Sequence, residues 1–333
     1  MAYQIFPYFA FRTPLLPFNE QFLVCDRNTL FNHFSNPHIQ EAFFLASPVL
    51  YREIEKVISA EISNQKEIDR IIDSFVRYFS RMHTRCTPFG LFAGCGTGKV
   101  TESEETDILL NDTCQRKTRL DMLFQYALYD TMIRMPGVKE KIRYYPNSSL
   151  YVLGNKYRYV ESVNTPTGVI YRLSETMKSI YLRKVLKAAT KGADMEVLIN
   201  SLTNETISKE DASEFINQLI DAQVIVGELN RAITGSDFFD RMISLIESIN
   251  EQSSLLNLLK EIRSALDKAD HDRNGIDTYQ HIVSLVKQTN ILYQEKFLFQ
   301  VDTIVKPLNA SLGIKVVEEL KSTFVFLNRT QMS

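Results

Sequence analysis

The chain has 333 residues, of which 44% are hydrophobic and 23% are charged. This is ordinary globular usage at a length for about two domains, so it excludes a disordered or fibrous protein. Thirty-eight Lys and Arg residues stand against forty Asp and Glu residues, for a net charge of -2. A nucleic-acid partner would therefore have to use a local basic patch.

The sequence has no apolar run of the roughly 18 residues that a membrane span needs, and its first residues lack the layout of a signal peptide. We therefore expect a cytoplasmic protein. The four cysteines, Cys25, Cys86, Cys95 and Cys114, form no CxxC pair. This spacing argues against a disulfide framework or a zinc site and favours reduced thiols that pack in the fold.

Residues 1–138 mix short strand and helix patterns, which indicates an α+β scaffold. Helices are predicted near 39–60 and 66–85, followed by the Gly-rich stretch GLFAGCGTGKV. In the second helix, apolar residues recur at helical spacing and leave Arg77, Arg81 and Arg85 in one stripe off the buried face. A solvated helix face explains such a stripe, but Thr87-Pro88-Phe89-Gly90 follows at once, so the guanidinium groups could also lie beside an accessible backbone.

Residues 139–230 have the pattern of an inserted winged-helix module of three strands and three helices. Strands 150–153 and 157–160 flank the turn dipeptide Gly154-Asn155, and GVIYRL supplies a third strand. Alternation places Tyr157 and Tyr159 on one face and Lys156, Arg158 and Val160 on the other. Three short helices follow: the second is capped by Asp194, and the third begins with a capping-box pattern at Ser208 and Asp211.

Residues 231–333 read as three helices to about residue 290 and then a strand, FLFQVDTIVKP, that returns to the first part of the chain. The chain stops at FVFLNRTQMS without a C-terminal capping pattern, so we expect the natural protein to continue beyond residue 333.

Several stretches resemble known binding or catalytic motifs but lack residues that the chemistry of those motifs requires. GCGTGKVT encloses three residues instead of four between its glycines and lacks the hydroxyl that a phosphate loop needs after its lysine. DHDRNGIDTYQH lacks the closing glutamate of a calcium loop. The five histidines form no ligand pattern, and no GxSxG or HExxH motif occurs. We therefore expect neither a metal nor a cofactor.

The stretch RMHTRCTPFGLFAGCG, residues 81–96, resembles the N-terminal glutamylation region of the lantibiotic dehydratases. Their pattern has two arginines four apart, followed by Thr-Pro-Phe/Tyr-Gly-Leu-Phe. Other segments resemble the family in the same order and extend the likeness over nearly the whole chain: Arg12-Thr13-Pro14, ASPVLY at 46–51, Thr118-Arg119-Leu120-Asp121 and Gln300-Val301-Asp302.

The resemblance implies an enzyme that transfers glutamate from glutamyl-tRNA, its co-substrate, to Ser and Thr hydroxyls of a ribosomally made precursor peptide before elimination. It implies these site residues near the tRNA acceptor end: Arg12, Arg81, Arg85, Thr87, Asp121 and Asp302. Asp121 and Asp302 could hold the substrate ammonium or assist proton transfer, and the sequence does not divide these roles. A further family arginine falls beyond Ser333, so residues 1–333 alone need not be active.

By the same resemblance, residues 139–230 correspond to a precursor-recognition element to which a leader peptide adds as an extra strand. Other implied partners are a downstream elimination domain or cyclase and a second copy of the chain. A DNA-binding winged helix is the alternative for this module, but its third helix carries four acidic residues and one lysine, which suits phosphate poorly.

Two other functions stay open at this point. One is a related enzyme that uses a different aminoacyl-tRNA, for example to extend a peptide at its C-terminus. The other is a leader-binding module without catalysis, although the intact arginines and aspartates argue against such decay. From the main interpretation we expect the six site residues to converge on one concave surface with Arg12 at its edge, and the winged-helix sheet to leave one edge unpaired.

Overall fold

The computed structural model describes residues 5–18, 27–111, 114–165, 168–229, 236–249, 253–271 and 275–330, so Cys25 lies outside the described residues. The chain divides into two compact units. Unit 1 comprises Met1–Arg119, Ala265–His281 and Glu295–Ser333, and unit 2 comprises Leu120–Ser264 and Ile282–Gln294. The predicted α+β class is confirmed, including the segment of three strands followed by three helices.

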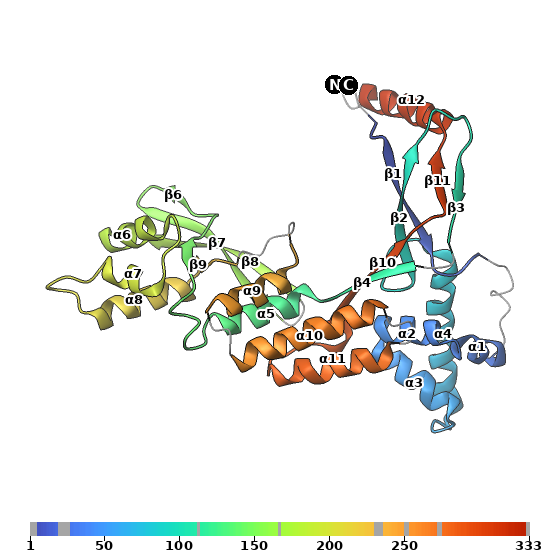
Figure 1. Ribbon diagram of the computed structural model, residues 1–333, viewed down its shortest axis with the longest axis horizontal. Helices are drawn as coiled ribbons and strands as arrows, with labels where there is room; N and C mark the ends of the chain where they lie inside the picture. The colour runs from blue at the N-terminus through green and yellow to red at the C-terminus, as the bar shows by residue number, and fades with distance from the viewer. Residues whose placement is uncertain are drawn as a thin grey trace. The chain divides into compact units, whose positions relative to one another are not determined.

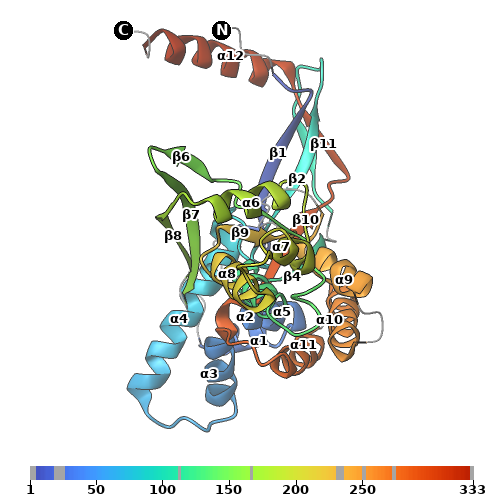
Figure 2. The ribbon, with the colours of Figure 1, turned by 90° about the vertical axis from the view of Figure 1, so that its left-hand side faces the viewer.

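Unit 1 contains a six-stranded sheet of order β3-β11-β2-β10-β4, with β1 paired to β2. Its strands are β1 (Tyr8–Pro14), β2 (Ala93–Val100), β3 (Asp107–Leu109), β4 (Cys114–Leu120), β10 (Phe299–Val305) and β11 (Asn309–Leu312). Strand β1 runs antiparallel to β2 along seven residue pairs, whereas β10 and β11 run parallel to β2. Figure 1 shows β1, β2, β11 and β3 side by side, and both Figures 1 and 2 show helix α12 (Ile314–Thr330) at the far end of these strands.

The Gly-rich stretch is strand β2, and its alternate glycines have a packing role. A Cβ atom at Gly96 would lie 2.3 Å from the Phe11 ring, and one at Gly98 would lie 2.5 Å from the Phe9 ring. The glycines therefore let the aromatic side chains of β1 lie flat against their neighbour strand. This agrees with the rejection of a phosphate loop for the same residues.

The first helices of the described chain belong to unit 1: α1 (Arg27–Phe34), α2 (Pro37–Ala46), α3 (Pro48–Ile58) and α4 (Gln65–Thr84). The single helix expected near 39–60 is wrong. Ser47 accepts a hydrogen bond from the Leu50 N–H at 3.3 Å, and Pro48 has no N–H to continue the preceding helix, so α2 ends and α3 begins there. Helix α4 matches its prediction, although one apolar residue of its helical pattern, Val76, is exposed.

The core of unit 1 is rich in aromatic rings that the helices and the start of β2 bring together. Phe43 of α2 packs edge-on against Phe75 of α4, with ring centroids 5.0 Å apart, and also contacts Phe92 at 5.7 Å. Beside these rings, the fully buried Glu41 forms an ion pair with Arg116 of β4. Helix α4 is thereby fixed against the sheet, with its C-terminal end leading into β2.

Unit 2 includes residues 139–230, the segment predicted as a winged-helix module. Its elements are α5 (Met122–Met132), β5 (Tyr144–Pro146), β6 (Tyr151–Leu153), β7 (Lys156–Thr165), β8 (Gly168–Met177), α6 (Ile180–Ala189), α7 (Met195–Asn200), α8 (Lys209–Asp221), β9 (Ile225–Gly227) and α9 (Phe238–Ile249). The hairpin at Gly154-Asn155 is confirmed, since Leu153 pairs with Lys156. Both predicted caps form: Asp194 accepts from the Val197 N–H and Ser208 from the Asp211 N–H.

The last apolar run of this region, β9, does not join the three-stranded sheet and pairs with β5. The remaining helices are α10 (Ser254–His271), α11 (Ile276–Gln288) and the 3-10 turn Glu295–Phe297, and α10 and α11 match the predicted helical patterns. Helix α12 was not predicted. No helix in the described ranges combines the length and hydropathy that a membrane crossing requires.

Candidate active site

One face of the large sheet is open and carries two of the six predicted site residues. Arg12 of β1 pairs with Cys95 of β2, which in turn pairs with Ile304 of β10, and all three residues are exposed. Residues that pair across neighbouring strands point to the same face, as do residues two apart on one strand. Asp302 therefore shares this open face with Arg12, while Val301 and Thr303 point into the core.

Asp302 lies near the end of the sheet at which β2 begins. Because Ile304 pairs with Cys95 in a parallel arrangement, Asp302 is level with Ala93, the first residue of β2. The connector that enters β2 there is the segment from α4 with the motif Thr87-Pro88-Phe89-Gly90. The Thr303 hydroxyl donates to the Gly90 carbonyl at 3.0 Å, which ties the connector to β10 next to Asp302.

The two arginines at the end of α4 differ in their surroundings. Arg81 is half-buried, and its guanidinium carbon lies 4.6 Å from the centroid of the Phe89 ring, a cation–π contact. Its Nε is buried and has no hydrogen-bond partner in the described part of the chain. Arg85 is the exposed C-cap residue of α4, and Thr87 is also exposed. The connector therefore leaves Arg85 and Thr87 accessible to a ligand.

Asp121 has a structural role that the sequence did not reveal. It is the N-cap of α5, and its carboxylate accepts a hydrogen bond from the Leu123 N–H at 2.8 Å. No hydrogen bond or ion pair in the described ranges joins Arg85, Thr87 or Asp121 to Asp302. The structure thus places Arg12 and Asp302 on one face and ties the connector to β10, and the full convergence of all six residues stays a prediction.

The structure adds one residue to this group, Arg119. Its guanidinium forms an ion pair with the carboxylate of Asp302, and it precedes Asp121 by two residues. The sequence contained a signal for it, because Arg119 belongs to the segment Thr118-Arg119-Leu120-Asp121 that resembles the family. The local sequence of β4 gives no hint of its partner, which lies 183 residues away.

A second candidate surface is the free edge of the small sheet in unit 2. The strand order is β6-β7-β8, so β8 pairs with β7 along ten residue pairs and its other edge has no partner strand among the described residues. The Lys178 N–H donates to the Asn155 carbonyl at 3.1 Å, which fixes the alternation of the ladder. It follows that the outward-pointing backbone groups belong to these residues: Val169, Tyr171, Leu173, Glu175 and Met177.

Side chains cover part of the opposite side of the sheet. Beyond the short strand β6, the Gln223 amide bonds both backbone groups of Ser162, and the Ser149 hydroxyl accepts from the Val160 N–H at 2.8 Å. The predicted faces are also confirmed: Tyr159 is buried, while Lys156 and Arg158 both contact Glu175 on the outer face. On that face several apolar side chains are exposed: Tyr151, Leu153, Val160, Tyr171, Leu173 and Met177.

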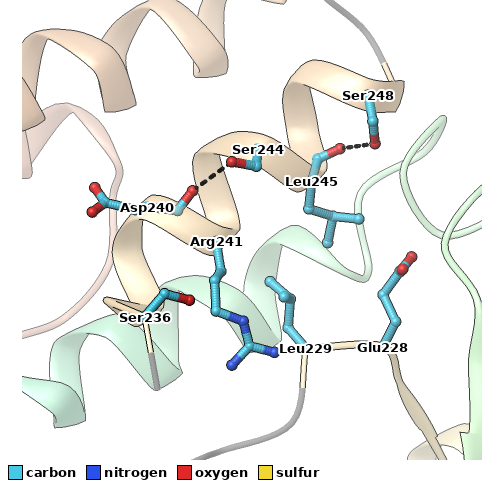
Figure 3. A pocket seen from close by; sticks show the side chains of 8 residues that line it. All are labelled: Glu228, Leu229, Ser236, Asp240, Arg241, Ser244, Leu245 and Ser248. Carbon is cyan, nitrogen blue, oxygen red and sulfur yellow. Dashed lines mark hydrogen bonds between the residues drawn. The ribbon is translucent and has the colours of Figure 1, made fainter. Parts of the chain in front are cut away.

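A shallow pocket of about 390 Å³ lies along α9 in unit 2 (Figure 3). Its carboxylates already have partners, since Asp240 pairs with Arg263 at 3.2 Å and Glu228 accepts from the Arg143 N–H at 3.0 Å. None of the predicted site residues lines it. The described residues also contain no cluster of His, Cys, Asp and Glu that could hold a metal ion.

A comparison with protein families shows to which family the chain belongs. The family described as "Lantibiotic dehydratase, N terminus" matches residues 35–331. The chain belongs to this family. Curated relatives include the subtilin biosynthesis protein SpaB of Bacillus subtilis, 23% identical over 86% of this chain, and the nisin biosynthesis protein NisB of Lactococcus lactis subsp. lactis, 21% identical over 88% of it.

Solved structures share the fold. The tRNA dependent lantibiotic dehydratase MibB from Microbispora sp. 107891 matches 95% of this chain and 30% of its own, with a TM-score of 0.77 at 17% identity. The glutamylation domain of TbtB, from thiomuracin biosynthesis, matches 86% of this chain and 34% of its own, with a TM-score of 0.59 at 17% identity. The lantibiotic dehydratase region described here spans only 28 to 30% of the length of its curated relatives.

Proposed function

We propose that this chain takes part in the transfer of glutamate from glutamyl-tRNA to Ser and Thr hydroxyls of a precursor peptide. The observation that carries the proposal is the open sheet face that Arg12 shares with the Arg119–Asp302 pair, next to the connector from α4. Support also comes from the printed descriptions of MibB as tRNA dependent and of TbtB as a glutamylation domain.

The reaction needs little beyond positioning and charge stabilisation. The peptide hydroxyl oxygen attacks the glutamyl carbonyl carbon, the ester bond to the tRNA ribose breaks, and the hydroxyl proton passes to the ribose oxygen. One ester is exchanged for another, so no cofactor or oxidant is required. Arginines suit the acceptor phosphates and the negative charge that develops on the carbonyl oxygen. Asp302 and Asp121 are the candidates for holding the substrate ammonium or relaying the proton.

The same proposal assigns the free edge of β8 to the leader part of the precursor peptide. A strand that adds to β8 would pair with the outward groups of Tyr171, Leu173 and Glu175, which supply affinity through main-chain hydrogen bonds. Residues that pair across an antiparallel ladder share a face, so alternate leader side chains would lie beside the exposed Tyr171 and Leu173. DNA is a poor alternative, because Glu210, Asp211 and Glu214 on α8 are exposed.

A transfer assay tests the proposal. The purified chain is incubated with the precursor peptide encoded beside its gene and with single aminoacyl-tRNAs, and the peptide is analysed by mass spectrometry. We expect a mass increase of one glutamyl residue on Ser or Thr with glutamyl-tRNA, and no increase after Arg81→Ala with Arg85→Ala. Transfer from another aminoacyl-tRNA would identify the related ligase instead. Leader binding without any transfer would identify a binding module.

Binding of protein partners is tested by sedimentation of the same purified chain. The family resemblance implies a second copy of the chain and a downstream domain or partner protein. Sedimentation at two protein concentrations measures self-association, and addition of the elimination domain of a longer relative measures association with that class of partner. Transfer that appears only after the domain is added would show that the site is completed by that domain.

A further inference from the structure

Strand β4 presents two arginines to opposite faces of the sheet, and their environments differ sharply. Arg116 points inward and pairs with the fully buried Glu41. Arg119 points to the open face, where its guanidinium pairs with Asp302, and both side chains are substantially exposed, at 36% and 47%. The Arg116 pair belongs to the core, whereas the Arg119 pair lies among the candidate site residues.

The backbones of both partners are held in place, so the Arg119–Asp302 contact is defined by the fold. Next to Arg119, the Thr118 N–H donates to Asp270 at 2.6 Å, and the Leu120 carbonyl accepts from Gln125 at 2.6 Å. Next to Asp302, Val301 and Thr303 are buried, at 6% and 7% exposure. Only the two side chains can adjust, and each constrains the other.

Stability does not account for this pair. An ion pair at this exposure contributes about 1 kcal/mol or less to folding, because water screens it and two long side chains lose freedom. The pair instead fixes where the carboxylate of Asp302 points. From this geometry we infer that Arg119 is a positioning residue for Asp302 in acyl transfer, an inference that rests on the function proposed above.

The consequence for the reaction follows from the role of a carboxylate in it. Whether Asp302 holds the substrate ammonium or relays the hydroxyl proton, its oxygen must keep a fixed position relative to the reacting ester. A carboxylate on a short side chain can rotate, and the guanidinium removes that freedom on one side. Loss of Arg119 should therefore slow the chemical step more than it weakens the binding of glutamyl-tRNA.

The test compares Arg119→Gln, Arg119→Lys, Asp302→Asn and the double variant Arg119→Gln with Asp302→Asn, all in the full chain. Arg52→Gln is the matched control, because Arg52 forms a similarly exposed long-range pair with Glu295, with two bonds of 3.0 and 3.1 Å, in the same unit. Steady-state transfer kinetics give kcat and KM for glutamyl-tRNA. Thermal unfolding of each variant verifies that the fold is intact.

We expect Arg119→Gln to lower kcat by about 10- to 100-fold while KM for glutamyl-tRNA changes less than about twofold. Arg119→Lys should recover part of the loss, because it restores the charge without the planar fork. The double variant should be no slower than Asp302→Asn alone, since the arginine acts through the aspartate. Arg52→Gln should behave as the unaltered protein does.

Three outcomes would overturn this role. Additive losses in the double variant would mean that Arg119 acts independently of Asp302. A raised KM at unchanged kcat would make Arg119 a tRNA contact. Unaltered kinetics in Arg119→Gln would leave the pair without a role in transfer. If the unaltered chain transfers no amino acid from any tRNA, with or without the added elimination domain, the proposed function itself is wrong, and the positioning role falls with it.

Discussion

The two sheets of this protein leave different kinds of surface accessible. The large sheet of unit 1 leaves a face open, and the groups that it offers are charged side chains: Arg12, Arg119 and Asp302. The small sheet of unit 2 leaves an edge open, and the groups that it offers are the backbone N–H and C=O groups of β8.

This difference matters because the two kinds of surface recognise different partners. Charged side chains attract a polyanion over a distance, and that attraction weakens as salt screens it. Backbone groups on a strand edge bind an extended peptide of nearly any composition, and neighbouring side chains supply the selectivity. Under the function proposed above, the tRNA end and the leader peptide would therefore use different kinds of surface.

The largest expected effect is a difference in stability between substitutions on the two faces of β4. Arg116→Met removes the guanidinium partner of the buried Glu41, and breaking a buried pair on one side costs about 3–5 kcal/mol of the free energy of unfolding. Arg119→Gln removes an exposed pair and should cost about 1 kcal/mol or less. Urea unfolding of both variants measures the difference. Equal losses would show that both faces of β4 carry structural ion pairs.

A proline tests the free edge. The N–H of Leu173 points away from β7, so Leu173→Pro removes an outward donor and leaves the β7–β8 ladder intact. We expect the affinity for the leader to fall by about tenfold, because one main-chain hydrogen bond is lost and the next one is weakened, while the affinity for tRNA stays the same. Leu173→Ala is the control for the side chain. Unchanged leader affinity in fluorescence anisotropy would contradict strand addition.

The sequence predicted the helices and strands of both units better than it predicted the tertiary contacts between them. Periodicity gave α4 and the hairpin of β6 and β7, because helical and strand spacing are local properties. The break at Ser47 and Pro48 was missed although both residues were visible, since the apolar pattern continues across it. The pairing of β9 with β5 was missed because pairing partners depend on the tertiary fold.

The candidate site shows the same limit. The arginines of α4 stand out by their helical spacing, and the family resemblance assigns them and Asp302 to the site. The shared face of Arg12 and Asp302 follows from a register that no local pattern encodes. Arg119 was passed over because its partner is 183 residues distant. The capping role of Asp121 does have a local signal, since an aspartate before a helix is a common N-cap.

A smaller effect than those of the substitutions above is the salt dependence of binding, which should differ between the open sheet face of unit 1 and the free edge of β8. Affinity for the tRNA acceptor end should fall with salt by roughly 0.7 to 0.9 log units per tenfold change for each phosphate contact, whereas leader affinity should change little. Arg81→Ala with Arg85→Ala should reduce the tRNA slope by the contribution of the lost contacts. A leader affinity that falls as steeply as the tRNA affinity would mean that both surfaces act by charge.

The smallest expected effect concerns the outer face of the small sheet, where charge and backbone recognition meet. The Lys156 ammonium, assisted by the Arg158 guanidinium, holds the pKa of Glu175 below its ordinary value of 4.5. A carboxylate with a lowered folded-state pKa stabilises the fold above its unfolded-state pKa, and this contribution disappears as the pH falls through the folded-state value. Lys156→Met should therefore raise the pKa of Glu175, as measured by NMR titration of its side chain, and Arg158→Met should raise it less. Because Glu175 is exposed, high salt should shrink the shift in the unaltered protein, and a shift that survives high salt would indicate that the pair is shielded from water by something beyond this chain.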